Sequence, residues 1–448
     1  MFDDIEQVVD KKFWRVINDL RVHATRKQRK PFLLELAKKL KHHEYFPSLP
    51  LTVKEADKGF SVARQIPIFN LEDYSVYYYC VRKLEHVLAK NRIKGTYGGW
   101  SMGGKLRNLE DFEDPGDEYS LTYSYNPAAW SKYYGDFNAR LYGKIKEIQD
   151  SNNPRQVVFE LDIANYYDNI QLSILENKIR QDADYSESGI LDLLMYFLGY
   201  SNRLVTHYQK RSVGIPQDAF GDCSRLLANY YLQDYDLFMN ELTKQHGASY
   251  FRYADDQIIF VPSDAVGHSI IQLASRKLAQ IGLNFNQQKV ARRTLDELYT
   301  YRSFDINDIF QEPNSKKDAT KVNEFAYRAF EAIDQDVSCL KNRGYPLIKR
   351  LLNAEYNLLS PTYRARLMAY VFDKEFTKAG KAYNFRMAYE KMYEDEKNGY
   401  LILLNDLLDN CSHSAFHYEI LTFYRQLGLD TERLENRIAE LKKDIYSI

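Results

Sequence analysis

Cysteine is scarce in this sequence, and the four thiols among its 448 residues are widely separated. They are Cys80, Cys223, Cys339 and Cys411. No Cys-x-x-Cys pair and no Cys/His spacing typical of zinc ligands occurs, so we expect neither a zinc site nor a disulfide framework. Scattered free thiols are typical of a reducing compartment, and we expect the protein to lie in the cytoplasm.

Long apolar runs are also missing. The start "MFDDIEQVVD" is acidic and lacks the apolar core of a secretory signal peptide. The longest apolar stretch, "ILDLLMYFLGY", is too short and too polar to span a bilayer. We therefore expect no signal peptide, no membrane-spanning helix and no membrane partner.

Neither sign of charge is in excess, because 61 Lys and Arg face 62 Asp and Glu. This balance conceals a basic segment near the start. Residues 11–41 hold eleven Lys and Arg against only Asp19 and Glu35. Such a segment would attract the phosphates of a nucleic acid. A solvated helix face explains the same composition equally well.

Local patterns predict a change of structural class along the chain. Residues 1–50 read as basic helices, and residues 51–70 read as a hairpin. Residues 95–154 show no regular period and include an aromatic-rich run. Residues 155–310 alternate strands with helices, whereas a 3.6-residue period dominates beyond about residue 315. The sequence therefore predicts an α+β region followed by an all-α region.

The stretch "QVVFELDIANYYDNI" places one aspartate at the end of a buried strand. Residues 157–161 form a nearly continuous apolar run, as in strands that are covered on both faces. The run ends at Asp162, at the carboxyl end of the strand, where open sheets place their chemistry. A cap or turn role for Asp162 alone is an equally good explanation. The next helix is expected to begin at Ser173, with Glu176 completing a capping box.

The stretch "FRYADDQIIF" places two adjacent aspartates, Asp255 and Asp256, at the tip of a predicted hairpin. Adjacent carboxylates repel each other and resist burial, so a simple turn would favour Asn-Gly or Asp-Gly instead. If the strands that carry Asp162 and this pair are neighbours, three carboxylates converge. Such a group suits Mg²⁺, and two ions roughly 3.5–4 Å apart can activate a 3′-hydroxyl and stabilise a leaving pyrophosphate.

These motifs resemble those of reverse transcriptases in order and spacing. "YADD" resembles the YxDD box, and "FELDIANYYDNI" resembles the first palm motif, which bears an aspartate. "GIPQDAFGDCSRLLANYYLQDYD" is similar to the motif that begins Gly-x-Pro-Gln and continues into a long palm helix. "IGLNFNQQKV" resembles the next motif, "YRSFDINDIF" the hairpin that grips the primer, and "SVARQIPIFNLEDY" the fingers motif. The expected apolar face of the palm helix is Leu226, Leu227, Tyr230, Tyr231, Leu237 and Phe238.

The resemblance covers about residues 50–310 and implies a right-hand polymerase fold, of class α+β. It implies a basic helical segment at 1–50, fingers with an aromatic-rich insert at 51–155 and a palm at 156–310. An α-helical domain at 311–448 would replace the thumb or be repeat-like. The implied cofactors are two Mg²⁺ ions, with Mn²⁺ as an alternative. The implied catalytic and metal-binding residues are Asp162, Asp255 and Asp256, with the carbonyl of Ile163 as a further metal ligand.

The resemblance also implies a nucleotide site. Arg64 would lie over the triphosphate, where a guanidinium can take phosphate oxygens bidentately, and an exposed strand arginine is the alternative. Tyr167 falls where reverse transcriptases carry an aromatic sugar gate, which excludes a ribose 2′-hydroxyl and favours DNA as the product. A core role for this ring is the alternative. Gln217 would pack beside the nascent base pair, and Lys289 would approach the triphosphate.

The sequence departs from the common reverse transcriptase pattern at two positions. Asp218 replaces a common glycine, and Arg225 replaces the proline of a common Ser-Pro. The C-terminal third shows no maturase, endonuclease or RNase H signature. A polymerase followed by helices resembles the unknown-group and abortive-infection reverse transcriptases of bacterial phage defence. That branch implies a cognate non-coding RNA template, deoxynucleotides, a DNA product and, as an open question, a homo-oligomer.

Three other functions remain open from the sequence. The first is template-independent DNA synthesis primed by a protein tyrosine. The second is a non-catalytic RNA-binding protein that keeps the polymerase shape, although the three aspartates disfavour it because they repel phosphate without metal. A group II intron or retron enzyme is the third and weakest alternative.

Overall fold

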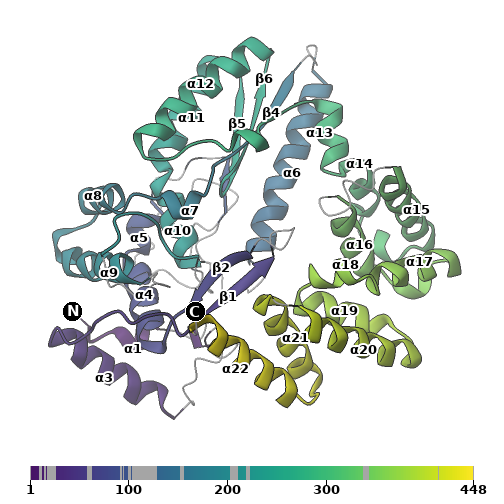
Figure 1. Cartoon of the computed structure of the whole chain (residues 1–448). Helices are drawn as coiled ribbons and strands as arrows, with labels where there is room; N and C mark the ends of the chain where they lie inside the picture. Colours follow the sequence, from purple (N-terminus) through teal and green to yellow (C-terminus); the bar gives the residue numbers. More distant parts are fainter. Residues whose placement is uncertain are drawn as a thin grey trace. The chain divides into compact units, whose positions relative to one another are not determined.

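The computed structural model describes residues 2–9, 13–14, 17, 27–57, 63–90, 93, 95–98, 102, 129–151, 156–201, 210–217, 222–335, 343–411 and 413–446 (Figure 1). Its contacts divide the chain into two compact units. The sheet unit comprises Met1–Val53 and Ile66–Leu295, and the helical unit comprises Lys54–Gln65 and Asp296–Ile448. No helix in the described ranges is long and apolar enough to cross a membrane.

A five-stranded sheet forms the centre of the sheet unit, in the order β3-β5-β6-β4-β7. Its strands are β3 (Thr96–Tyr97), β4 (Val157–Asp162), β5 (Ser249–Tyr253), β6 (Asp256–Val261) and β7 (Ala291–Thr294). All neighbours are antiparallel except β3 and β5, which run parallel. The predicted strand ending at Asp162 and the predicted hairpin at residues 249–261 are therefore confirmed, and they lie side by side.

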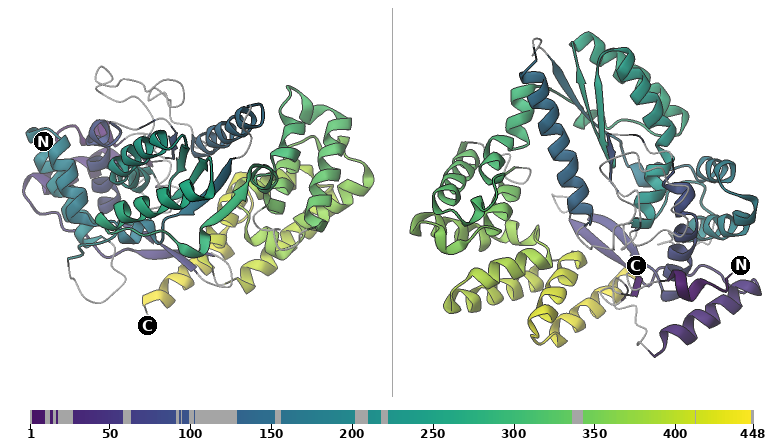
Figure 2. Two further views of the ribbon diagram at one scale, coloured as in Figure 1. Left: turned by 90° about the horizontal axis from the view of Figure 1, so that it is seen from above. Right: turned by 180° about the vertical axis from the view of Figure 1, so that it is seen from behind.

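Helices cover both faces of this sheet (Figures 1 and 2). The helices are α6 (Ala129–Gln149) on one face and α11 (Gln233–Gln245) and α12 (Asp264–Gln280) on the other. On β4 the Phe159 ring meets His268 of α12, with centroids 5.4 Å apart. On β5 the Tyr253 ring meets Phe137 of α6 at 5.7 Å. Since side chains alternate along a strand, each strand contributes to both layers.

Helix α6 is a correction to the sequence analysis, which described residues 95–154 as irregular. Phe137, Leu141, Ile145 and Ile148 recur every three or four residues and are all at most 2% exposed. That spacing is typical of a helix with one buried stripe. The many tyrosines and the glycines at 135 and 143 obscured the pattern in the sequence.

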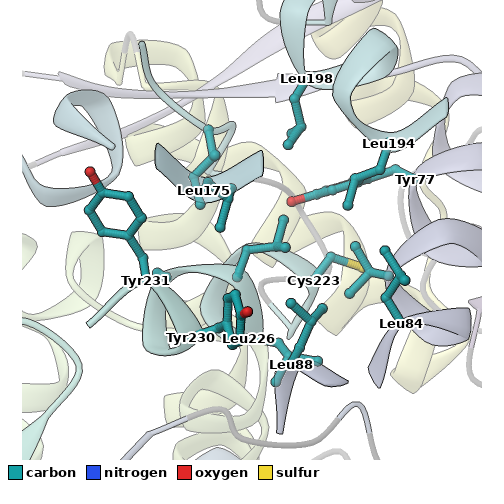
Figure 3. Packing of buried hydrophobic residues seen from close by; sticks show 14 of the residues in the cluster. Tyr77, Leu84, Leu88, Leu175, Leu194, Leu198, Cys223, Leu226, Tyr230 and Tyr231 are labelled. Atoms are coloured by element: carbon teal, nitrogen blue, oxygen red, sulfur yellow. The ribbon is translucent and has the colours of Figure 1, made fainter. Parts of the chain in front are cut away.

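A second group of helices packs beside the sheet and shares its core (Figure 3). They are α1 (Ile5–Val8), α3 (Arg29–Lys41), α4 (Leu71–Lys83), α5 (Glu85–Leu88), α7 (Tyr166–Asn169), α8 (Leu172–Asp182), α9 (Ser188–Tyr200) and α10 (Asp222–Tyr231). Figure 3 shows Tyr77 of α4, Leu194 of α9 and Leu226 of α10 converging in one apolar cluster. This cluster anchors the helices that flank the carboxyl end of β4.

Two local expectations in this region are wrong. Helix α8 begins at Leu172 and has no side-chain cap, because the Leu172 N–H instead donates to the carbonyl of Ser212 at 2.9 Å. Glu176 accepts from Arg180 on the exposed helix face, so the capping box is absent. The palm helix is interrupted at Leu232, and α11 begins at Gln233. The buried face of α11 includes Tyr235 and Met239, so Leu237 is 41% exposed rather than part of the apolar face.

The helical unit has a separate apolar core. Its principal helices are α13 (Leu295–Tyr301), α14 (Phe304–Asn307), α15 (Ala319–Gln335), α16 (Tyr345–Leu352), α17 (Pro361–Val371), α18 (Lys374–Lys378), α19 (Ala382–Lys391), α20 (Glu394–Asn410), α21 (Ser414–Leu427) and α22 (Glu432–Tyr446). Short 3₁₀ turns lie at Tyr185–Glu187, Gln287–Lys289, Asp308–Phe310, Ser315–Lys317 and Tyr356–Leu358. The predicted all-α C-terminal region is thus confirmed.

The stretch "YRSFDINDIF" is helical rather than a hairpin, which corrects the expected primer grip. Phe304, Ile306, Ile309 and Phe310 are all less than 9% exposed, and the last three belong to the core of the helical unit. Their burial on one side of successive turns outweighs the alternating pattern that suggested strands. The predicted hairpin at residues 51–70 is observed as a two-stranded sheet of β1 (Thr52–Asp57) and β2 (Ala63–Ile68).

Candidate active site

Two carboxylates meet where β4 ends and β6 begins. Asp162 is the last residue of β4, and its cross-strand partner is Asp256, the first residue of β6. Cross-strand partners point to the same face of a sheet, so both side chains lie on the side opposite α11 and α12. Asp162 is 5% exposed, whereas Asp256 is exposed. A buried carboxylate beside an exposed one requires compensating positive charge.

The third carboxylate belongs to a tight turn. Tyr253 pairs with Asp256, so Ala254 and Asp255 alone connect β5 to β6. Ala254 has a φ of +53°, in the left-handed region that residues with a Cβ rarely adopt. Two-residue hairpins of primed type require such positive φ values because their twist matches that of the strands. The turn therefore fixes Asp255, which is half-buried, next to the Asp162–Asp256 pair.

A lysine supplies the compensating charge. The Lys289 Nζ donates to Asp162 Oδ2 at 2.9 Å. Partial burial alone would lower the pKa of Lys289, but the bond to Asp162 and the charges of Asp162, Asp255 and Asp256 together raise it. The neighbouring backbone holds this segment in place, because the Asn286 N–H donates to the carbonyl of Asp162 at 2.7 Å. All three predicted carboxylates thus act on one cation.

The same arrangement can be tested as a metal site. In the ranges that the structure describes, no three side chains of His, Cys, Asp or Glu are close enough to form a metal site by themselves. Mg²⁺ is commonly held by only one or two carboxylates plus substrate phosphates. The bridge between Ile163 and Phe285 uses the Ala164 N–H and the Asp162 carbonyl, which leaves the Ile163 carbonyl outside that bridge. The donor set fits a cation that arrives with a triphosphate.

Two residues predicted to contact the nucleotide lie on segments that a backbone hydrogen bond joins. Tyr167 is in the short helix α7 and is half-buried, and its ring lies 5.6 Å from that of Tyr166. Tyr166 is the core residue of the pair, since it is buried and its hydroxyl donates to the carbonyl of Ala228. The Ile215 N–H donates to the carbonyl of Tyr167 at 2.9 Å, which joins the segment that leads to Gln217. Gln217 itself is half-buried.

The other residues singled out in the sequence are Arg64, Asp218 and Arg225. Arg64 is an exposed residue of β2, in the helical unit, and its contact with a triphosphate stays a prediction. Asp218 lies outside the described residues. Ser224, which precedes Arg225, donates to the carbonyl of Pro216 and lies 2.8 Å from the Tyr77 hydroxyl. Burial raises the pKa of Tyr253, and the nearby Arg225 charge opposes that rise.

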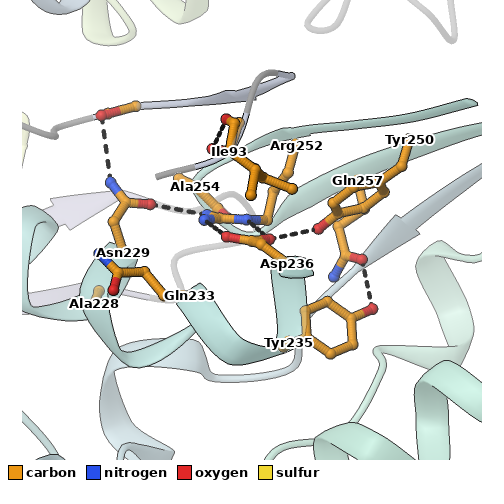
Figure 4. A network of polar contacts seen from close by, with 12 residues as sticks. Ile93, Ala228, Asn229, Gln233, Tyr235, Asp236, Tyr250, Arg252, Ala254 and Gln257 are labelled. Atoms are coloured by element: carbon orange, nitrogen blue, oxygen red, sulfur yellow. Dashed lines mark hydrogen bonds and ion pairs between the residues drawn. The ribbon is translucent and has the colours of Figure 1, made fainter. Parts of the chain in front are cut away.

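Sequence reasoning missed a buried ion pair directly behind the turn (Figure 4). Arg252 is 0% exposed and pairs with Asp236 of α11, and both face away from the carboxylates. The signal was present in "FRYADD", where a charged residue occupies a position of β5 that alternation assigns to the buried face. The buried partner, however, lies 16 residues earlier in a helix and could not be inferred from the strand.

One family model matches the part of the chain that contains these carboxylates. Residues 109–327 match the family model described as reverse transcriptase (RNA-dependent DNA polymerase). That range includes seven of the eight predicted site residues, all except Arg64. No curated protein matches the chain.

Among solved structures, similar chains are telomerases of yeasts. A Candida albicans telomerase in complex with a telomeric RNA fragment is 12% identical, with 93% of this chain and 70% of that chain covered and a TM-score of 0.39. Apo telomerase from Candida tropicalis is 12% identical, with 91% and 74% covered and a TM-score of 0.37. The same enzyme truncated from its C-terminal domain is 11% identical, with 57% and 53% covered and a TM-score of 0.36.

The family match, the strand-end aspartate and the YADD turn fall in one continuous region, in the order that the sequence motifs predicted. Residues 109–327 are therefore similar to the family described as reverse transcriptase (RNA-dependent DNA polymerase), and this similarity spans the strand-end aspartate and the YADD turn.

Proposed function

We propose that this protein is an RNA-directed DNA polymerase that works with two divalent cations. The observation that carries the proposal is the register of Asp162 with Asp256, beside the turn that presents Asp255. A purely structural turn gains nothing from three carboxylates that repel one another. Divalent cations bound there would activate a primer 3′-hydroxyl and stabilise the leaving pyrophosphate.

The chain's own residues would then divide the work. Asp162 and Asp255 hold the cations with help from the carbonyl of Ile163, and Asp256 completes the acidic group. Lys289 neutralises Asp162 in the absence of substrate, and its 61% exposed side chain is free to turn toward a triphosphate when one arrives. Arg64 would take phosphate oxygens with its planar fork of donors.

Substrate selection would depend on α7. Tyr167 stands five residues after Asp162, and its carbonyl is tied to the segment that leads to Gln217. A ring held there would fill the space that a ribose 2′-hydroxyl needs, so deoxynucleotides would be preferred. Gln217 lies two residues after Ile215, whose N–H donates to the Tyr167 carbonyl, and would pack beside the nascent base pair.

We also propose a role in bacterial phage defence, in the cytoplasm, with a dedicated non-coding RNA as template. This part rests on the resemblance of a palm followed by a helical C-terminal region. The helical unit supports it only in that its residues form an independent all-α core. Protein-primed synthesis without a template is an outcome that the same experiment would reveal.

The test is to sequence the nucleic acid that copurifies with the protein from cells. Three forms are compared: the natural chain, the double variant Asp255→Asn with Asp256→Asn, and Asp264→Asn as a matched control. Asp264 is an exposed carboxylate of α12 that pairs with Arg292, so its loss removes charge but not the site.

We expect DNA complementary to one copurified RNA in the natural chain and the control, and none in the double variant. Random or homopolymeric DNA joined to protein would instead indicate that synthesis is primed by the protein and uses no RNA template. New DNA that persists in the double variant would refute the assignment of the aspartates.

A further inference from the structure

The guanidinium behind the catalytic turn is held as a plane (Figure 4). Arg252 heads the group of large, fully buried side chains in the described residues. Its Nε donates to Asp236 Oδ1 at 2.7 Å, and its Nη2 donates to Asp236 Oδ2 at 2.5 Å. A bidentate pair of this kind fixes the orientation of the guanidinium as well as its charge.

The opposite edge of the same guanidinium faces the turn. Its Nη1 donates to the carbonyl of Ala254 at 2.7 Å and to Asn229 Oδ1 at 2.8 Å. Ala254 immediately precedes Asp255. One side chain therefore connects the α10–α11 junction to the residue that sets the geometry of the turn.

Holding the Ala254 carbonyl has a direct consequence for Asp255. The peptide group is planar, so the carbonyl of Ala254 and the N–H of Asp255 share one plane. Fixing that plane limits the directions in which the Asp255 side chain can leave the backbone. The conformation needs support, because a left-handed φ is unfavourable for a residue with a Cβ.

The N–H side of Ala254 is held as well. It donates to the carbonyl of Tyr97 in β3 at 3.3 Å. Asn229 reaches the same place, since its Nδ2 donates to the carbonyl of Gly98 at 3.4 Å. A Cβ on Gly98, whose φ is +105°, would lie 3.2 Å from the Ala254 nitrogen, so glycine permits this close approach. The turn is therefore held from both sides of Ala254.

Stability alone does not explain this arrangement. Replacing a buried ion pair by apolar side chains of similar volume is often neutral or stabilising, so the pair itself is weak evidence of a stabilising role. A lysine could neutralise Asp236, but a single ammonium lacks the planar fork that serves Asp236, Asn229 and the turn carbonyl together. The features that require arginine are those that connect to the turn.

We propose that Arg252, oriented by Asp236 and Asn229, is a positioning residue that directs the Asp255 carboxylate toward a divalent cation. The inference rests on the proposed function, because it gives the turn its purpose. It adds three residues that contact neither substrate nor metal and that act only through the Ala254–Asp255 peptide.

The decisive variant removes both charges together. In Arg252→Met with Asp236→Leu, no charge is left buried without a partner, so the fold is expected to survive. The turn carbonyl nevertheless loses its donor. We expect the affinity for Mn²⁺, measured by electron paramagnetic resonance on the full chain without nucleic acid, to fall about 10- to 100-fold. We expect kcat to fall by a similar factor.

A matched control perturbs the same network without touching the turn. The Tyr250 hydroxyl donates to Asp236 Oδ1 at 2.8 Å. Tyr250→Phe therefore removes one hydrogen bond to Asp236 but keeps the bond from Arg252 to the Ala254 carbonyl. We expect Tyr250→Phe to lower thermal stability and leave Mn²⁺ affinity within twofold of the natural chain. A purely structural network would instead make Mn²⁺ affinity follow stability across both variants.

The possible outcomes separate the two proposals. The inference would be overturned if the double variant had the same Mn²⁺ affinity and kcat as the natural chain. It would also be overturned if the natural chain bound no Mn²⁺. A natural chain that binds Mn²⁺ but makes no DNA would refute the proposed function, while Mn²⁺ affinity would still decide the inference. If the double variant fails to fold, Arg252→Lys decides, since it keeps the charge and is expected to lose Mn²⁺ affinity in the same direction.

Discussion

Alanine at position 267 is expected to destabilise the sheet unit, although glycine-to-alanine changes normally stabilise a helix. Gly267 is a buried residue of α12, where this helix packs on β4. An added Cβ would lie 2.2 Å from Cε2 and 2.8 Å from Cδ2 of Phe159. Ordinary contact begins at 3.4 Å, so the ring or the helix must retreat by about 1 Å.

The magnitude follows from two opposing terms. Alanine gains about 1 kcal/mol over glycine in a helix interior. Forcing extra volume into a packed core costs about 1–3 kcal/mol. Phe159 is 2% exposed and has little room to move, so we expect a net loss of about 1 kcal/mol in the free energy of unfolding. Because Asp162 is three residues further along β4, we also expect lower polymerase activity.

Helix α6 offers matched controls for the same substitution. No heavy atom lies within 4 Å of a Cβ added at Gly135 or Gly143. Gly135→Ala and Gly143→Ala should therefore each stabilise the protein by up to about 1 kcal/mol. Urea unfolding followed by circular dichroism would compare the three variants, and Phe159→Leu added to Gly267→Ala should recover part of the loss. If Gly267→Ala stabilises the chain as the controls do, the close approach of α12 to β4 is not a constraint.

Four further outcomes follow from single positions. Tyr167→Val should raise ribonucleotide incorporation on the order of 10- to 100-fold in primer extension, and unchanged selectivity would exclude the sugar gate. Burial raises the pKa of Asp73 from 3.8 to about 7, so between these values the folded state binds a proton that the unfolded state does not. The free energy of unfolding should therefore fall as pH rises from about 4 to 7, and Asp73→Asn should flatten that slope in denaturation curves. Ala254→Gly should stabilise the hairpin by about 0.5–1 kcal/mol in urea unfolding, because it relieves the left-handed φ. Lys289→Met should tighten Mn²⁺ binding about two- to fivefold in the nucleotide-free protein, because the competing ion pair is half-exposed and weak; weaker binding would contradict that competition.

The strand and hairpin that carry the three aspartates could be predicted from sequence because their signals are local. An apolar run ending at Asp162 and an alternating run broken only by two residues define β4 and the β5–β6 turn without reference to the rest of the chain. Their adjacency required one further assumption, that the carboxylates share a purpose. The register of Asp162 with Asp256 confirms that the strands are neighbours.

The errors have a common physical origin in tertiary packing. Leu237 has the period of a buried residue, but the helix is interrupted at Leu232 and α11 buries Tyr235 and Met239 instead. Ser173 and Glu176 have the spacing of a capping box, but the backbone of Leu172 already finds a partner in Ser212. In each case a contact with a distant segment outweighed a favourable local pattern, and no propensity reports such contacts.

The two faces of the sheet explain why one part of the site was visible in the sequence and the other was not. On the face of Asp162 and Asp256, carboxylates gather at the strand ends, so the local sequence is unusual and is recognisable. On the opposite face, the charge of Arg252 is cancelled by Asp236 and by hydrogen bonds, so it contributes to a core like any other buried side chain. The turn joins the two faces, because its carbonyl is held on one side while its carboxylate is presented on the other. A change that spares every carboxylate can therefore still misdirect one of them, and loss of activity with an intact fold is the expected signature of that failure.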